Sequence, residues 1–170
     1  MLTYQVKPLL ADPGSAFPVE ETVPMENMRI GGDEVRFLSP VRLTGTLRAI
    51  GQGAIRFEGQ ADALAAMNCS RCTKSTQVSL HCDISQRFIA ERLEEQADME
   101  DAEVFENDLI DLNDLLYSEI SMAVPMKVLC KENCLGLCPI CGKDLNEGPC
   151  QCQQEDTDPR WDALKNLFHQ

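Results

Sequence analysis

The sequence predicts an α+β fold, in which an antiparallel β-sheet body carries a few helices and a cysteine-rich, zinc-binding C-terminal tail. Three observations support this prediction. The first half alternates apolar and polar residues, residues 112–124 carry an apolar stripe with helical spacing, and eight of the nine cysteines form close pairs. We expect one compact unit made of a β body (1–90), an acidic flexible segment (91–110), and a helix, tail and C-terminal helix packed on the body (111–170).

The β body is predicted from three segments with a period of two. Apolar and polar residues alternate over 41–49, from about 55 to 67, and over 78–84. This alternation is typical of half-buried strands, and Gly51-Gln-Gly53 supplies a turn between the first two. Three antiparallel strands joined by short turns follow from this pattern.

The first 30 residues are less regular. Residues 2–10 are compatible with an edge strand, while Pro13-Gly14 and Pro18 indicate an irregular connection. The apolar residues that follow keep no sustained period, so no further strand is predicted before residue 30.

Two helices are predicted in the second half. Asp111 can cap a helix from Leu112 to about Val124, and Pro125 ends it. The stripe consists of Leu112, Leu115, Leu116, Ile120 and Ala123. A last helix begins at Asp158-Pro159, and we expect its apolar face, with Trp161, Leu164, Leu167 and Phe168, to pack on the body.

The net charge of −13 is concentrated in one part of the chain. Residues 1–90 carry nine basic and nine acidic side chains, whereas residues 91–119 carry twelve acidic and one basic side chain, a net charge of −11. Such a block is typical of a solvated, flexible segment, and it can also attract a basic partner. The balance disfavours direct capture of a phosphate backbone, which requires a cationic patch.

The cysteines indicate metal binding. We expect no secretory signal or transmembrane helix, and therefore a cytoplasmic protein in which disulfides are disfavoured. The four pairs are Cys69/Cys72, Cys130/Cys134, Cys138/Cys141 and Cys150/Cys152. Neither histidine lies in a cysteine cluster, so two all-thiolate zinc sites are indicated. The ninth cysteine, Cys82, shares the apolar face of its segment and is interpreted as a core residue.

The spacing favours one division of these ligands. Cys138-Pro-Ile-Cys141-Gly followed by Cys150-Gln-Cys152 can fold into a local site, which by elimination leaves Cys69/Cys72 for Cys130/Cys134. The second site would connect the tail to the tip of a β-hairpin. Two alternatives remain: a zinc ribbon of Cys69/Cys72 with Cys138/Cys141, or a single zinc with the other pairs free and redox-active.

No pattern in the chain indicates an enzyme. Gly31-Gly32 and Gly51-Gln-Gly53 are isolated turns and not phosphate-binding loops, no serine nucleophile motif occurs, and no base lies beside a three-ligand metal set. We therefore predict neither catalytic residues nor a small-molecule substrate.

An ordered series of motifs resembles the YceD family, the large ribosomal RNA subunit accumulation proteins. In order they are Ile110-Asp-Leu, Ala123-Val-Pro125, Cys130, Cys134-Leu-Gly-Leu-Cys138-Pro-Ile-Cys141-Gly, Asp144-Leu-Asn146, Cys150-Gln-Cys152 and Asp158-Pro-Arg160, and the earlier Cys69-Ser-Arg-Cys72 also matches. The resemblance implies a non-enzymatic bacterial or plastid factor that supports normal levels of large-subunit ribosomal RNA. Family genes often adjoin the gene for a small basic ribosomal protein, so the implied partner is such a protein or a pre-ribosomal particle.

Three mechanisms are compatible with the sequence. In the favoured one, the acidic block attracts a cationic ribosomal protein. In the second, the chain contacts RNA directly through strand and hairpin cations, namely Arg42, Arg48, Arg56, Arg71 and Lys74. In the third, thiol oxidation releases zinc and makes the protein a redox switch.

Overall fold

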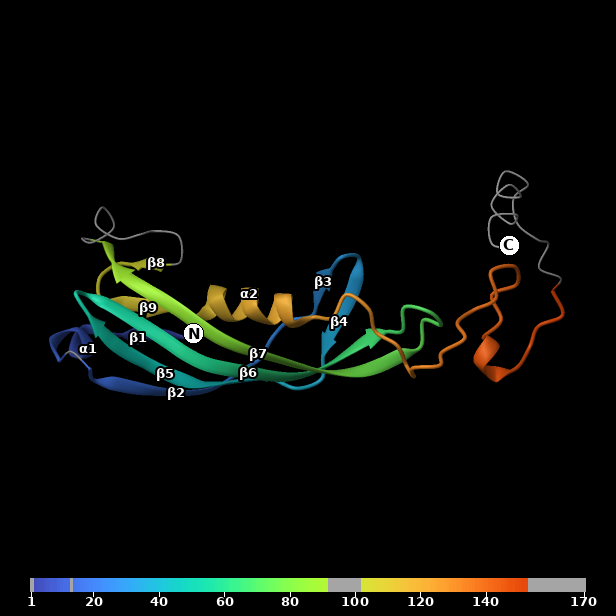
Figure 1. Ribbon diagram of the computed structural model, residues 1–170, viewed down its shortest axis with the longest axis horizontal. Helices are drawn as coiled ribbons and strands as arrows, with labels where there is room; N and C mark the ends of the chain where they lie inside the picture. The colour runs from blue at the N-terminus through green and yellow to red at the C-terminus, as the bar shows by residue number, and fades with distance from the viewer. Residues whose placement is uncertain (1, 13, 92–101, 153–170) are drawn as a thin grey trace, which may run out of the picture.

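A computed structural model describes residues 2–12, 14–91 and 102–152 (Figure 1). The elements in chain order are β1 (Thr3–Gln5), α1 (Lys7–Ala11), β2 (Ala16–Val23), β3 (Met28–Ile30), β4 (Asp33–Phe37), β5 (Val41–Gly51), β6 (Ala54–Asn68), β7 (Ser75–Ala90), β8 (Ala102–Phe105), β9 (Leu109–Asp111), α2 (Asn113–Ala123) and the 3₁₀ turn η3 (Leu145–Glu147). The predicted α+β class, with a mainly antiparallel sheet, is confirmed. Within the described residues, no helix is both long enough and apolar enough to cross a membrane.

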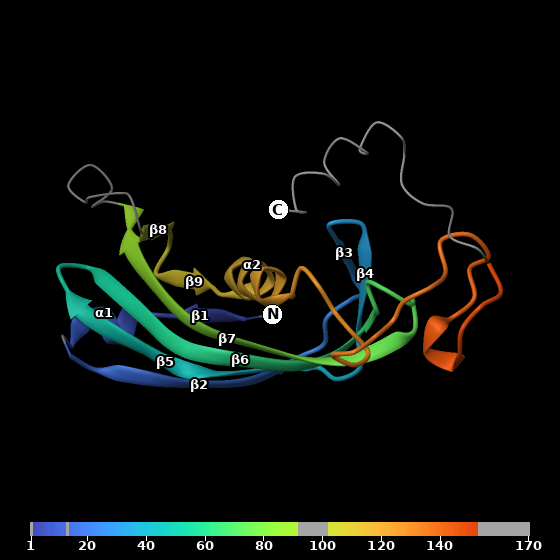
Figure 2. The same cartoon turned by 45° about the vertical axis from the view of Figure 1, so that its right-hand side comes forward.

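The long hairpin of β6 and β7 is the axis of the main sheet (Figures 1 and 2). β7 pairs along the whole of β6, while β5 and then β4 occupy the opposite edge of β6. β2 extends the sheet beyond β5, and β8 joins β7 in parallel. A separate pair, β1 with β9, lies with α2 over one face of this sheet.

The core lies between this face and α2. The predicted strands are β5, β6 and β7, and their alternation places Leu47, Phe57 and Leu80 on the buried side. α2 contributes Leu115, Leu116 and Ile120, which are three members of the predicted stripe. Cys82 is half-buried and packs against this core, in agreement with its interpretation as a core residue.

Two glycines allow β5 and β6 to approach under an aromatic ring. Gly45 and Gly59 are direct cross-strand partners. A Cβ atom on Gly59 would lie 2.5 Å from the Thr44 carbonyl oxygen and 2.8 Å from the Phe57 ring, and one on Gly45 would lie 2.7 Å from the same ring. Glycine at both positions therefore leaves space for the fully buried Phe57 side chain.

The substitution Gly59→Ala should lower the free energy of unfolding by about 1–3 kcal/mol, because the added methyl group overpacks this contact. Urea unfolding would measure the change. The double variant with Phe57→Leu should be less destabilised than the sum of the two single variants, since the shorter side chain removes one clash. Strict additivity would contradict this account of the glycine pair.

The first 30 residues form regular secondary structure although their apolar and polar residues show little periodicity. Residues 3–5 form a strand, but residues 7–11 are helical, so the proposed edge strand over 2–10 is wrong in its second half. The proposed irregular connection around Pro18 is also wrong, because Ala16–Val23 forms β2. β2 is an edge strand with one buried residue, Val19, and such a strand tolerates proline and shows little alternation.

The acidic segment contains more regular structure than its charge suggests. Its second half forms β8 and β9, which pair with β7 and β1 because the apolar Phe105 and Ile110 supply core contacts. Residues 92–101 lie outside the described residues. α2 begins one residue later than predicted: the N-cap is Leu112, and Asp111 accepts a hydrogen bond from the Asn113 backbone N–H at 2.9 Å.

The cysteine-rich tail is placed differently from our expectation. We expected it to pack on the body as part of one compact unit, whereas the structure places residues 130–152 at and beyond the tip of the β6–β7 hairpin (Figures 1 and 2). Its few apolar groups explain this position, because Leu129 and Leu137 pack against the cysteines at the tip and not against the main core. The predicted last helix, 158–168, lies outside the described residues.

Candidate metal centres

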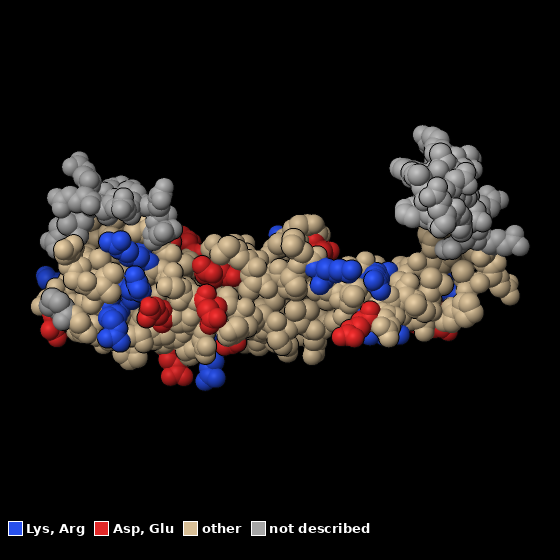
Figure 3. Space-filling model, in the orientation of Figure 1, with Lys and Arg blue, Asp and Glu red and all other residues tan. Residues whose placement is uncertain are grey.

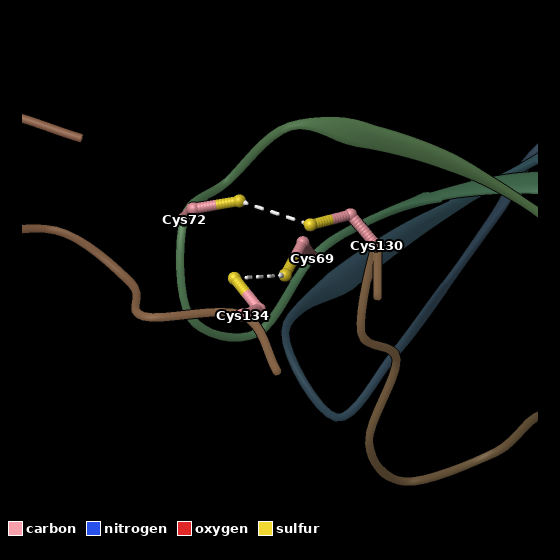
Figure 4. A group of neighbouring side chains, drawn as sticks. All are labelled: Cys69, Cys72, Cys130 and Cys134. Carbon is pink, nitrogen blue, oxygen red and sulfur yellow. Dashed lines mark hydrogen bonds between the residues drawn. The ribbon is translucent and has the colours of Figure 1, made fainter. Parts of the chain in front are cut away.

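The hairpin tip is a tight turn that holds two cysteines. The Cys69 N–H donates to the Lys74 carbonyl oxygen at 2.8 Å, and the Thr73 N–H donates to the Cys69 carbonyl oxygen at 2.9 Å. These bonds close the turn between β6 and β7. They turn the side chains of Cys69 and Cys72 toward a common point (Figure 4).

The tail contains a second turn with the same hydrogen bonds. The Cys138 N–H donates to the Lys143 carbonyl oxygen at 2.8 Å, and the Gly142 N–H donates to the Cys138 carbonyl oxygen at 2.9 Å. The Ile140 N–H points at the Cys138 sulfur, 3.4 Å away. The two Cys-x-x-Cys segments are therefore the same knuckle built twice, each presenting two sulfurs.

The residue after the second cysteine differs between the knuckles. Gly142 has φ of +71°, and the equivalent Thr73 has φ of +60°. A β-branched residue is rare in this left-handed region, at a cost of about 1–2 kcal/mol. The Thr73 hydroxyl donates to the Cys72 carbonyl oxygen at 2.7 Å, which offsets part of that cost.

The substitution Thr73→Gly should therefore leave the fold intact and raise the free energy of unfolding by up to about 1 kcal/mol. Gly142→Thr is the matched reverse change and should lower stability. Thermal unfolding of the metal-loaded protein would compare the two variants. Equal shifts in the same direction would show that the left-handed conformation is not the controlling factor.

The first cysteine cluster joins the hairpin tip to the start of the tail (Figure 4). The sulfurs of Cys69 and Cys134 lie 3.8 Å apart, and those of Cys72 and Cys130 lie 3.5 Å apart. All four sulfurs lie within 4.8 Å of one another. Three of the four cysteines in this cluster are buried, namely Cys69, Cys72 and Cys134.

The second cluster lies wholly within the tail. Its members are Cys138, Cys141, Cys150 and Cys152, whose sulfurs also lie within 4.8 Å of one another. The sulfurs of Cys138 and Cys150 lie 3.4 Å apart. The geometry therefore groups the cysteines as the favoured division does, and not as a ribbon of Cys69/Cys72 with Cys138/Cys141.

These separations suit a tetrahedral metal ion. Zinc–sulfur bonds of about 2.3 Å place the sulfurs of a regular tetrahedron about 3.8 Å apart. A disulfide would require about 2.05 Å. Within the described residues, each group contains four cysteines and neither a histidine nor a carboxylate. Four sulfurs fill the tetrahedron, so neither cluster resembles a catalytic site with an open position.

The thiols of each cluster are electrostatically unequal. Burial raises the pKa of Cys69. The backbone N–H groups of Arg71, Cys130 and Cys72 together outweigh this effect and lower the pKa to about 6. In the same cluster, the hydrogen bond with Cys72, together with burial, raises the pKa of Cys130 to about 12. Four thiolates at this spacing repel one another, so the fully ionised cluster requires a cation.

The tail cluster shows the same inequality. Backbone N–H groups of Cys141 and Ile140 lower the pKa of Cys138 to about 6. The hydrogen bond with Cys141, together with burial, raises the pKa of Cys152 to about 12. Both knuckles thus direct backbone donors at their first sulfur, which stabilises a thiolate there.

Backbone and arginine contacts attach the tail to the hairpin tip. The Ser70 N–H donates to the Val128 carbonyl oxygen at 2.8 Å, and the Val128 N–H donates to the Ser70 hydroxyl at 3.2 Å. The Arg71 guanidinium donates to the Cys134 carbonyl oxygen at 2.6 Å, and its own carbonyl oxygen accepts from the Leu137 N–H. Arg71 is therefore a positioning residue of the first cluster.

Asn146, which lies between Cys141 and Cys150 in the sequence, contacts the first cluster, a role that sequence reasoning missed. Its amide nitrogen donates to the Cys134 sulfur at 3.4 Å, and its amide oxygen accepts from the Leu135 N–H at 3.0 Å. Asp144 accepts from the Asn146 N–H at 2.8 Å and forms an ion pair of 2.9 Å with Lys74. The signal for this role in the sequence is the motif Asp144-Leu-Asn146.

The ion pair between Asp144 and Lys74 also shifts the pKa of both residues. Lys74, followed by the donors of Asn146, lowers the pKa of Asp144 to about 2. Asp144 and Glu147 in turn raise the pKa of Lys74. Lys74 is one of the cations that the sequence suggested for an RNA-binding face. In the structure, Lys74 instead pairs with Asp144 of the tail.

Comparison with known proteins agrees with these motifs. The family model described as "Large ribosomal RNA subunit accumulation protein YceD" matches residues 57–168, which include both knuckles. The chain belongs to the YceD family. The resemblance inferred from the cysteine motifs is therefore confirmed, and the name of the YceD family associates it with large-subunit ribosomal RNA.

Curated relatives of this YceD chain are distant in sequence. The uncharacterized protein YlbN of Bacillus subtilis is 26% identical over 159 residues, which cover 93% of this chain and 91% of the relative. An uncharacterized protein of Mycobacterium tuberculosis is 26% identical over 183 residues, with coverage of 98% and 81%. The chloroplastic YCED homolog 1 of Arabidopsis thaliana is 23% identical over 144 residues, with coverage of 68% and 45%. No solved structure matches this chain.

Proposed function

We propose that this protein is a non-enzymatic, cytoplasmic zinc-binding factor in the biogenesis of the large ribosomal subunit, where it supports the accumulation of large-subunit ribosomal RNA through protein contacts. The match to the YceD family model over residues 57–168 carries this proposal. The matched region includes nearly all of the β6–β7 hairpin, α2 and both cysteine clusters, so both candidate metal centres lie within it.

Zinc is proposed as a structural ion at both clusters. The support is chemical: four thiols at tetrahedral spacing, backbone donors aimed at the sulfurs, and a tail with little apolar surface to bury. Cys69, Cys72, Cys130 and Cys134 would hold the ion that fixes the tail to the hairpin. Cys138, Cys141, Cys150 and Cys152 would hold the ion that folds the tail itself.

The proposed partner is a basic large-subunit ribosomal protein or a pre-ribosomal particle. Residues 102–119, on β8, β9 and α2, contain six acidic side chains and no basic one. Partial burial, together with the neighbouring Asp114 carboxylate, raises the pKa of Glu103, so charges from β8 and α2 gather at one place. Such a field would attract a cationic protein over a distance of about one Debye length.

Deleting the gene should lower the amount of large-subunit relative to small-subunit ribosomal RNA, and the wild-type gene should restore it. A variant with serine at all four tail-cluster positions should restore it less well. An unchanged RNA ratio in the deletion strain would contradict the proposed function.

The protein contact has a separate test. Neutralising Glu103 and Asp114 with Gln and Asn should weaken retention of basic large-subunit proteins in a pull-down, most strongly at low salt. The matched control neutralises Glu20 and Glu21 on β2, which are exposed acids distant in sequence from this surface. Equal retention by both double variants would exclude the acidic surface as the contact.

A further inference from the structure

Three arginines form a single row across adjacent strands of the sheet. Arg48 on β5 is the direct cross-strand partner of Arg56 on β6, and Arg56 is the direct partner of Arg87 on β7. Direct partners project from the same face, here the outer face opposite α2. Figure 3 shows a column of basic side chains crossing the strands at the end of the molecule that holds β8.

This row is unfavourable for folding by itself. Like charges directly opposite each other on neighbouring strands are destabilising. The next row along the sheet consists of Thr46, Glu58 and Ser85, so it offers one carboxylate to three guanidinium groups. That carboxylate approaches Arg56 only to 3.8 Å in an exposed ion pair. The Nε atom of Arg87 is buried and has no hydrogen-bond partner within the described residues.

Three other cations that the sequence suggested for RNA contact already have partners within the protein. Arg42 forms an ion pair of 3.6 Å with Glu20, Arg71 binds the Cys134 carbonyl oxygen, and Lys74 binds Asp144. Of the five cations that the sequence suggested for RNA contact, only Arg48 and Arg56 belong to the row. Arg87, which the sequence analysis did not select, completes it.

We propose that the row Arg48–Arg56–Arg87 binds successive phosphate groups of an RNA strand. Strand spacing sets the backbone positions of the three arginines about 4.8 Å apart, so their side chains leave the sheet in a line that suits a polymeric anion. Each guanidinium can donate two parallel hydrogen bonds to one phosphate, which a lysine cannot do. This inference rests on the proposed function, which supplies RNA as the polymeric anion. It deepens that function by naming an RNA contact that protein binding alone would not require.

Binding of a short single-stranded RNA to the full-length, zinc-loaded protein would test the site, with fluorescence anisotropy as the readout. Three phosphate contacts predict a slope of about −2 for log K against log salt, which is a loss of about 20-fold between 50 and 200 mM salt. The Arg56→Gln variant should bind more weakly and should lose only about sevenfold over the same range, because one contact is gone.

Arg42→Gln is the matched control, because it removes the same charge from the same face of the sheet, on the neighbouring strand β5. It should keep the affinity and the salt dependence of the wild type. Thermal unfolding should show that Arg56→Gln is at least as stable as the wild type, since the substitution relieves repulsion within the row. A loss of binding in this variant would then reflect the site and not the fold.

Three outcomes would overturn the inference. The first is the absence of salt-dependent RNA binding, and the second is an equal loss of RNA affinity in Arg42→Gln and Arg56→Gln. The third is displacement of RNA from the row by poly-glutamate at equal charge concentration. The deletion strain distinguishes this inference from the proposed function. If RNA binding is absent while the deletion strain still loses large-subunit RNA, the row is excluded and the proposed function stands.

Discussion

Replacing Cys134 with serine should reduce the bound zinc from two ions per chain to one. The sulfur of Cys134 lies 3.8 Å from that of Cys69, accepts a hydrogen bond from Asn146 and is buried, so a hydroxyl cannot replace it as a zinc ligand. Loss of this ion should also release the tail from the hairpin tip. Zinc content of the purified variant, measured by atomic emission, checks the expected stoichiometry.

Cys82→Ser is the matched control, because Cys82 lies outside both clusters and should leave two ions bound. Combination with other variants then tests the grouping of the ligands. Adding Cys69→Ser to Cys134→Ser should remove no further zinc, whereas adding Cys150→Ser should remove the second ion. A ribbon of Cys69/Cys72 with Cys138/Cys141 would instead leave Cys134→Ser with unchanged zinc content.

Removal of both metal ions should unfold residues 130–152 while the sheet remains folded. Structural zinc supplies about 10–16 kcal/mol of folding free energy in small zinc-binding peptides at neutral pH. The tail has little to replace it, since the group at the hairpin tip contains only three buried cysteines with Leu129 and Leu137 packed against them. The main core draws on β5, β6, β7 and α2 and contains neither cluster.

Limited proteolysis with and without a chelator would measure this difference. The chelated protein should be cut first between residues 130 and 152, while far-UV circular dichroism should keep its β-sheet signal. Restoring zinc should restore protection, which separates metal loss from irreversible damage. A tail that stays protected after complete zinc removal would show that protein contacts, and not the metal, hold it.

The central strands were predictable because their burial is one-sided. β5, β6 and β7 each place one face against the core, so apolar residues recur at every second position and the sequence shows it directly. The stripe of α2 was predictable for the same reason, at helical spacing. Edge and short strands such as β2, β8 and β9 bury too few side chains to leave a pattern.

The candidate ligands could be named from the sequence, but the contacts around them could not. Close cysteine pairs without nearby histidines specify thiolate ligands whatever the surrounding fold. The role of Asn146 depends on a hydrogen bond across twelve positions, and that of Arg71 on one across sixty-three. Contacts of this range depend on where the tail runs, which no local pattern records.

The sequence by itself determined the alternating strands, the helix that covers them and the four close pairs of cysteines, whereas their grouping into two sets of four came from the structure. All three arise from local spacing, which sets the faces of a strand or helix and brings cysteines of one turn together. Only the tertiary structure decided that the tail continues past the hairpin tip and that three arginines share one row. The row depends on strand register, because pairing over fifteen positions of β6 and β7 fixes which distant residues become neighbours. The path of the tail depends on its contacts with Ser70 and Arg71 at the hairpin tip.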